Sequence, residues 1–184
     1  MRGFQMMLAA ACLAVGFGAA ASANDGKPID CGDAGLKFDA PGFKTTCKDY
    51  SDPTASTGGM TFALKRMAIH ALSESDGTFV DAIDDHILGT TRVYYNKTSL
   101  ENDISRYFNG DFTQWTDSDE VGGFDVKHFS AKFRGDQEPL DCAAFRRLGA
   151  RRYSGISGMT VGIACSLAGR DRTDEALKHF AEGN

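Results

Sequence analysis

The sequence predicts an α+β fold: a single compact domain with a mainly antiparallel sheet, two or three packed helices and two disulfides. Segments with strand-like alternation outnumber those with helical periodicity and follow one another in runs, which is typical of antiparallel sheets rather than of alternating βαβ units. The length of 184 residues fits one domain. Proline occurs only four times and aromatic residues reach 10%, so a packed core is expected rather than disorder.

The first 23 residues have the layout of a secretory signal peptide. Arg2 is their only charged residue, an apolar run extends from Met6 to Ala20, and Ala21-Ser22-Ala23 forms a small-x-small cleavage site. The run is shorter than the ~20 residues that a membrane-spanning helix needs. A lipid anchor on Cys12 is the rival interpretation, but the apolar run continues well past that cysteine.

Cleavage after the leader leaves a flexible mature N-terminus over residues 24–30 and a folded domain over 31–184. This mature chain has no transmembrane segment, and we expect it to be periplasmic or secreted. The formal net charge of the whole chain is −5, which argues against nucleic acid as the main partner because phosphate binding needs a basic face.

Four cysteines remain after removal of the leader, an even number that predicts disulfides in an oxidising compartment. They are Cys31, Cys47, Cys142 and Cys165. The long interval between the second and the third favours local pairing, Cys31 with Cys47 and Cys142 with Cys165, among the three possible connectivities. None has the close C-x2-C spacing of zinc sites or of thioredoxin-type redox pairs, and we expect neither a metal nor another cofactor.

The first half of the mature chain predicts a short strand at 36–40, a turn-rich surface loop at 50–59, and a strand at 60–72. The last segment also fits a helical stripe through Met60, Leu64, Met67 and Ala71. We favour the strand because two glycines precede the segment and a polar turn follows it.

Residues 78–88 fit a helix better, because Phe79, Ile83 and Ile87 recur at i, i+4 and i+8 and a glycine follows at position 89. A short strand is expected at 92–95. Residues 98–108 then predict a second helix that begins with capping-box spacing.

Alternating apolar positions predict strands at 121–133, 142–145 and 160–165. The alternation changes phase within the first of these, which indicates a bulge or a strand buried on both faces. Residues 173–181 predict a closing helix with Leu177 and Phe180 directed inward.

Catalytic chemistry has few candidates in this sequence. Asp84, Asp85 and His86 offer donor atoms for a metal, but on the predicted helix the two carboxylates point to different faces, so a solvated helix face is the better interpretation. His70 and His128 are the histidines that a small hydrolase would use with nearby acids. The chain contains no G-x-S-x-G motif, and no catalytic residue is assigned.

The most unusual local feature is a basic hairpin within a chain of net negative charge. Its candidate binding residues are Arg146, Arg147, Arg151, Arg152 and Tyr153. Guanidinium groups recognise carboxylates and phosphates in a planar, bidentate way, and the tyrosine adds a stacking surface. The alternative is a set of exposed arginines that pair with neighbouring acids.

The stretch from Asp141 to Tyr153, with its continuation from Thr160 to Cys165, resembles the C-terminal block of small uncharacterised secreted proteins of Gram-negative bacteria. This resemblance implies a periplasmic location and carries no catalytic residue. At the level of the fold, the stretch from Phe38 to Phe43 and the closing helix are similar to the PsbP-like α/β/α sandwich.

These observations lead to two functional hypotheses of different classes. The first is a non-enzymatic periplasmic binding protein, or envelope-associated accessory protein, whose hairpin from Arg146 to Tyr153 contacts an anionic partner protein or envelope component. The alternative is a small periplasmic hydrolase that acts on envelope carbohydrate or peptide.

Overall fold

The computed structural model describes residues 25–57, 59–88, 98–133, 135, 138–152, 155–167 and 169–182. The predicted signal peptide and the predicted strand at 92–95 lie outside the described residues. No helix in the part of the chain that the structure describes is long and apolar enough to cross a membrane.

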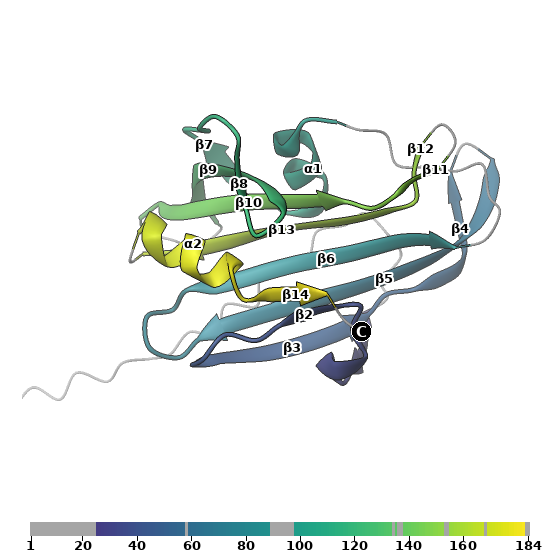
Figure 1. Ribbon diagram of the computed structural model, residues 1–184, viewed down its shortest axis with the longest axis horizontal. Coiled ribbons are helices and arrows are strands. Elements are labelled where there is room, and N and C mark those ends of the chain that lie inside the picture. Colours follow the sequence, from purple (N-terminus) through teal and green to yellow (C-terminus); the bar gives the residue numbers. More distant parts are fainter. Residues whose placement is uncertain are drawn as a thin grey trace, which may run out of the picture.

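A ten-stranded antiparallel sheet forms the body of the molecule (Figure 1). Its main path runs in the order β1-β3-β5-β6-β13-β10-β9-β7, with β4 paired to β5 and β8 paired to β9. The strands are β1 (Lys27–Ile29), β3 (Phe43–Asp49), β4 (Asp52–Thr57), β5 (Met60–Ser73), β6 (Phe79–Leu88), β7 (Asp111–Thr113), β8 (Asp119–Val121), β9 (Phe124–Lys132), β10 (Leu140–Leu148) and β13 (Gly158–Ser166).

Different elements cover the two faces of this sheet. Figure 1 shows α2 (Arg170–Leu177) and the pair β2 (Leu36–Phe38) and β14 (Phe180–Glu182) in front of the large sheet. The 3-10 turn η1 (Cys31–Asp33) precedes β2 on the same side, which we call the front face. The back face carries α1 (Leu100–Tyr107).

Each face has its own apolar core. On the front face Leu36, Phe38 and Leu177 pack against sheet residues such as Val126 and Phe145. On the back face α1 inserts apolar side chains against strands β6, β9, β10 and β13. The central strands are therefore buried on both sides, and each has apolar residues on both of its faces.

The predicted antiparallel sheet and both predicted disulfides are confirmed. Cys31 is bonded to Cys47, and Cys142 is bonded to Cys165 across directly opposite positions of β10 and β13. Strands dominate more than the predicted α+β class implies, with two α-helices among the described residues.

Several predicted elements are confirmed with small shifts in their bounds. The segment 60–72 is the long strand β5, and 98–108 contains α1, whose N-cap Ser99 accepts a hydrogen bond from the backbone N–H of Asn102. The phase change within 121–133 reflects burial on both faces, because β9 pairs with β10 in unbroken register. The closing helix begins at Arg170 and ends at Leu177, and Phe180 belongs to β14.

Two predictions are wrong. The predicted loop at 50–59 contains strand β4, a polar edge strand that pairs with the first half of β5. The predicted helix at 78–88 is strand β6, which lies between β5 and β13. Because β6 is buried on both faces, its apolar residues do not alternate, and their spacing matches a helix by coincidence.

The contact between Phe145 on β10 and Gly162 on β13 lies at the centre of the front face. A Cβ atom at Gly162 would clash with Cζ of Phe145 and with the backbone oxygen of Asp81. The phenylalanine ring therefore occupies the space that a side chain would need. It also contacts the rings of Phe124 and Phe180, with centroid distances of 5.4 and 5.1 Å.

We expect Gly162→Ala to lower the free energy of unfolding by about 3 kcal/mol or more, because the added methyl group meets backbone as well as ring. Urea denaturation measures this loss. Gly77→Ala is the matched control: its φ is +70° but the surrounding space is open, so the cost is about 1 kcal/mol. Equal losses in the two variants would contradict the packing argument.

Candidate functional site

The register of three neighbouring strands brings together a polar row on the front face. Strand β13 lies between β10 and β6, and its Thr160 is directly opposite Arg147 on one side and Asp84 on the other. Alternation along β6 places Asp84 and His86 on the same face as the core residue Val80. Residues far apart in the sequence therefore meet at one end of the sheet.

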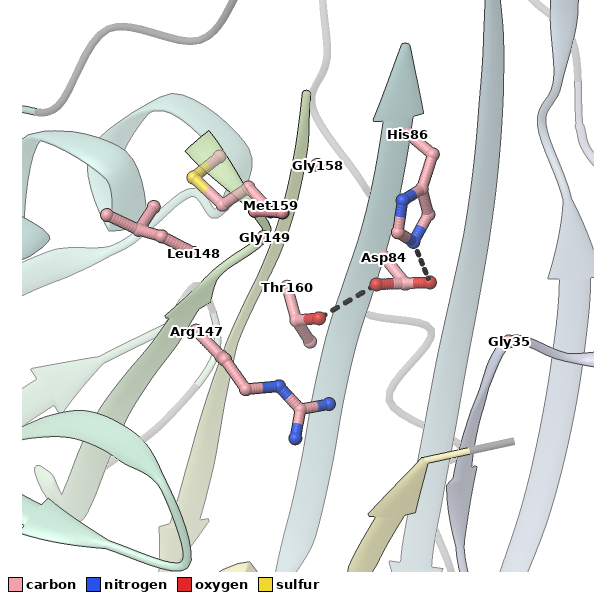
Figure 2. A pocket seen from close by; sticks show the side chains of 10 residues that line it. Gly35, Asp84, His86, Arg147, Leu148, Gly149, Gly158, Met159 and Thr160 are labelled. Atoms are coloured by element: carbon pink, nitrogen blue, oxygen red, sulfur yellow. Dashed lines mark hydrogen bonds and ion pairs between the residues drawn. The ribbon is translucent and has the colours of Figure 1, made fainter. Parts of the chain in front are cut away.

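These side chains line a pocket of about 410 Å³ (Figure 2). Its volume falls in the range typical of sites for small ligands. The lining residues are Gly35, Asp84, His86, Arg147, Leu148, Gly149, Ala150, Gly158, Met159 and Thr160.

Asp84 is the buried acid of the pocket, with 6% of its surface exposed. The Thr160 hydroxyl donates to Oδ1 at 2.7 Å, and Nε2 of His86 lies 3.0 Å from Oδ2 (Figure 2). Burial acts to raise the pKa of Asp84. The two hydrogen bonds, together with the charges of His86 and Arg147, outweigh burial and lower it.

His86 is the exposed partner of this pair, with 46% of its side chain accessible. Its hydrogen bond to Asp84 raises the pKa of the imidazole above its ordinary value of 6.5. A carboxylate on one ring nitrogen fixes the ring and favours the cationic form, leaving Nδ1 for other contacts.

Arg147 enters the pocket from β10 with its guanidinium over the ring of Phe124, 4.7 Å from the centroid. Such stacking holds the planar guanidinium in place over the ring. In Figure 2 its side chain extends past Thr160 on the same side of the sheet as Asp84.

Two glycines allow the backbone to form the pocket wall. A Cβ atom at Gly158 would lie 2.6 Å from Nδ1 of His86, and one at Gly35 would lie 3.1 Å from Oδ2 of Asp84. Larger residues at these positions would displace the imidazole or crowd the carboxylate.

Among the predicted binding residues, Arg146 and Arg147 point to opposite faces of β10. Arg146 is directed to the back face and is only 5% exposed. Its Nη1 donates to Asp103 at 2.7 Å and to the Thr98 carbonyl at 2.8 Å, and Nη2 lies 3.3 Å from Asp125. Arg146 therefore anchors α1 to the sheet and does not belong to an exposed patch with Arg147.

The rest of the predicted basic segment forms the hairpin of β11 (Arg151–Arg152) and β12 (Gly155–Ile156). The structure describes only the backbone of Arg151 and Arg152, and Tyr153 lies outside the described residues. The hairpin follows directly after the pocket residues Gly149 and Ala150.

The histidines considered for hydrolysis each have one carboxylate partner. Nδ1 of His70 lies 2.6 Å from Asp81, and Nε2 of His128 lies 3.1 Å from Asp174. Within the described residues, neither imidazole is hydrogen-bonded to a hydroxyl or thiol group that could serve as a nucleophile. The same part of the chain contains no group of three His, Cys, Asp or Glu residues placed to hold a metal ion.

The pairing of Asp84 with His86 is the feature that the sequence analysis missed. Residues at i and i+2 diverge on a helix but share a face on a strand. Interpreting 79–88 as a strand would have placed both side chains together, and the burial of Val80 and Ala82 on that same face would have indicated a site next to the core.

Comparisons with known proteins do not place the chain in a family. No family model matches it, and no curated protein or solved structure is significantly similar to it. The site must therefore be interpreted from its own geometry.

The histidines should titrate in a distinct order when imidazole signals are followed by NMR. His70 and His86 are expected to have pKa values above 6.5, because each is hydrogen-bonded to an aspartate. His128 should titrate below 6.5, since burial outweighs the charge of Asp174. Asp84→Asn should lower the pKa of His86 and leave that of His70 unchanged.

This pair also makes stability depend on pH. A raised pKa of His86 contributes stability below pH 6.5 that is lost as pH rises through its folded-state value. The lowered pKa of Asp84 contributes stability above its ordinary value of 3.8 that is lost on acidification through its folded-state value. A pKa of His86 at or below 6.5 would contradict the described contact.

Arg146→Met should lower the free energy of unfolding by about 3 kcal/mol or more, because it leaves the buried carboxylate of Asp103 without its partner. Lys127→Met is the matched control. Its ion pair with Glu101 also joins the sheet to α1, but both side chains are partly exposed, so the expected loss is below about 1 kcal/mol. Similar losses in urea denaturation would contradict this assignment.

Proposed function

We propose that this protein is a non-enzymatic binding protein of the bacterial envelope that takes an anionic group of its ligand or partner into the front-face pocket. Arg147 and His86 are the groups that bind the anion. The single observation that carries the proposal is their convergence beside the buried carboxylate of Asp84 in an open pocket of about 410 Å³.

The arrangement supports anion binding in two ways. A guanidinium group offers paired donors to a carboxylate or phosphate. Because Arg147 is already stacked on Phe124, its side chain loses less conformational entropy when an anion binds. The hydrogen bond that Nε2–H of His86 donates to Asp84 favours the cationic form of the imidazole, whose Nδ1–H can then donate to the same anion.

The hairpin remains part of the proposal as the surface beside the pocket. In this proposal Arg151, Arg152 and Tyr153 contact the remainder of the partner, while Arg147 contacts the group inside the pocket. A periplasmic location is proposed with it. The two disulfides support an oxidising compartment, since such bonds rarely persist in the cytosol.

The binding function fits the geometry better than the hydrolase hypothesis. His70 and His128 belong to two-residue pairs that, among the described residues, have no nucleophilic hydroxyl or thiol bonded to the ring. An acid–histidine pair without a positioned nucleophile lacks the third component of a nucleophilic hydrolytic site.

The test is an NMR titration of the purified 15N-labelled protein with inorganic phosphate and with acetate, at constant ionic strength and about pH 6. We expect both anions to shift the amide signals of Gly149 and Gly158 at millimolar concentrations. Arg147→Gln should weaken binding at least tenfold, since a charge-assisted hydrogen bond contributes about 1.5–3 kcal/mol.

Arg170→Gln is the matched control, because this arginine lies on α2 and is 55% exposed. The variant should bind phosphate and acetate with the affinity of the wild type. Arg147→Lys keeps the charge but loses the paired donors, so it should bind with intermediate affinity. Thermal denaturation of each variant checks folding. Wild-type affinity in Arg147→Gln, or shifts away from the pocket, would overturn the proposal.

A further inference from the structure

We propose that Lys44, Lys48 and His70 form a second anion-binding site, on the back face of the sheet, for a phosphate group. The three side chains come from the neighbouring strands β3 and β5 (Figure 1). This inference goes beyond the proposed function, because the site lies on the opposite face of the sheet from the pocket and shares no residue with it.

Strand alternation and register place the three side chains on one face. On β3, Cys47 belongs to the front core. Alternation therefore directs Lys44, Thr46 and Lys48 to the back face, where all three are exposed. His70 is directly opposite Thr46, so it shares this face and lies midway between the two lysines.

The spacing of these positions lets the three side chains contact one ligand. Directly opposite residues of an antiparallel pair have Cβ atoms roughly 4.5–5.5 Å apart, and diagonal neighbours are roughly 7–8 Å apart. Both lysines are diagonal neighbours of His70, a distance that their long side chains can cover. The hydroxyl of Thr46, between them, is directed to the carbonyl oxygen of His70 at 3.4 Å and is not needed as a donor.

A buried carboxylate holds the imidazole in the orientation that an anion needs. Nδ1 of His70 lies 2.6 Å from Oδ1 of Asp81, a residue with no exposed surface. The two nitrogens of an imidazole point in nearly opposite directions, so Nε2 is directed away from Asp81, and no residue that the structure describes is hydrogen-bonded to it. The hydrogen bond to Asp81 outweighs burial and raises the pKa of His70 above 6.5, which favours the cation whose Nε2–H is a donor.

The other oxygen of Asp81 indicates that its contact with His70 serves more than stability. Oδ2 is buried and, within the described residues, has no hydrogen-bond partner. Such an oxygen lowers stability, and an ion pair with a partly exposed imidazole offsets only part of that loss. The pair does orient His70 and keep it cationic, which is the state that binds an anion.

The two lysines carry charge that no acid neutralises. In the part of the chain that the structure describes, Lys44 has no ion-pair partner. Lys48 donates to the backbone carbonyl of Asp25 at 3.1 Å, not to its carboxylate. This bond uses one of the three donors of the ammonium group and leaves two for a ligand.

The acids near His70 do not compete for the lysines. On β6, the strand beside β5, Asp81 and Asp85 face this side and are both buried. Asp85 accepts hydrogen bonds from Arg66 and from the hydroxyl of Tyr107. Glu74, in the turn after β5, is exposed and forms no ion pair with the described residues.

The chemistry of the three donors favours phosphate over carboxylate. Lysine binds phosphate as a point charge, whereas a planar carboxylate is matched best by the paired donors of a guanidinium group. Three single donors that approach from different directions suit a tetrahedral oxyanion.

The test is an NMR titration of the purified 15N-labelled protein with inorganic phosphate and with acetate, at constant ionic strength and about pH 6.5. We expect phosphate to shift the amide signals of residues 44–48 and the imidazole signals of His70, with an affinity about tenfold or more above that of acetate. Glycerol 1-phosphate is titrated alongside, and the tighter of the two phosphates identifies free phosphate or a phosphomonoester as the ligand.

The double variant Lys44→Gln/Lys48→Gln should weaken phosphate binding at residues 44–48 by about tenfold or more, because it removes two charge-assisted hydrogen bonds. Lys132→Gln is the matched control, since Lys132 is an exposed lysine at the other edge of the sheet, directly opposite Asp111. This control should bind phosphate at residues 44–48 with wild-type affinity. Thermal denaturation confirms that each variant is folded.

Sulfate, a tetrahedral anion whose charge is constant over this range, tests the role of His70. Its affinity should fall as pH rises from about 5.5 to about 8.5 through the folded-state pKa of His70, because the imidazole loses a proton. His70→Gln should remove this pH dependence. Asp81→Asn should move it to lower pH, because the amide no longer favours the imidazolium.

The outcomes separate this inference from the proposed function. Wild-type affinity in the double lysine variant, an equal loss in Lys132→Gln, or an unchanged pH dependence in His70→Gln overturns the second site. The pocket is followed by its own signals, those of Gly149 and Gly158, so it stands or falls independently of these results.

Discussion

The ring of Phe145 lies where the side chain of residue 162 would otherwise be, and this contact joins the sheet to its cover. The ring reaches Phe124 on the next strand and Phe180 on β14, so one aromatic group connects β13, β10, β9 and the front layer. The contact depends on the register that places Phe145 directly opposite Gly162. That same register aligns Arg147 with Thr160 and thereby positions the pocket.

The two faces of the sheet use charge differently. On the back face, Arg146 and Asp103 are almost fully buried and hold α1 against the sheet. On the front face, Arg147 lies at the surface end of the core and its guanidinium lines the pocket. Adjacent arginines in the sequence thus have unrelated roles because strand geometry directs them to opposite sides. A basic cluster in a strand sequence therefore overstates the charge available on any one surface.

The disulfides, the antiparallel sheet and helix α1 could be predicted because cysteine spacing, alternation and capping are local signals. The pocket could not be predicted, since it depends on the register of three strands. The interpretation of 78–88 as a helix then separated Asp84 from His86, although the apolar spacing of Phe79, Ile83 and Ile87 fits either structure when both faces are buried. The sequence analysis named Arg147 as a candidate binding residue because of its guanidinium group. Thr160 and Asp84, which lie beside it in the sheet, are far away in sequence and could not be assigned to the same site.

Strand β2 lies near the start of the described chain and β14 near its end, and the two strands pair with each other. Every strand of the large sheet except β1 lies between them in sequence. The front cover is therefore the least local contact of the fold, and its closure loses the most chain entropy. Phe38 and the aromatic core around Phe145 lack the ring of Phe180 until β14 pairs with β2. Until that pairing forms, this apolar surface stays open to water, so the folding chain depends on β14 for protection of its front core from aggregation.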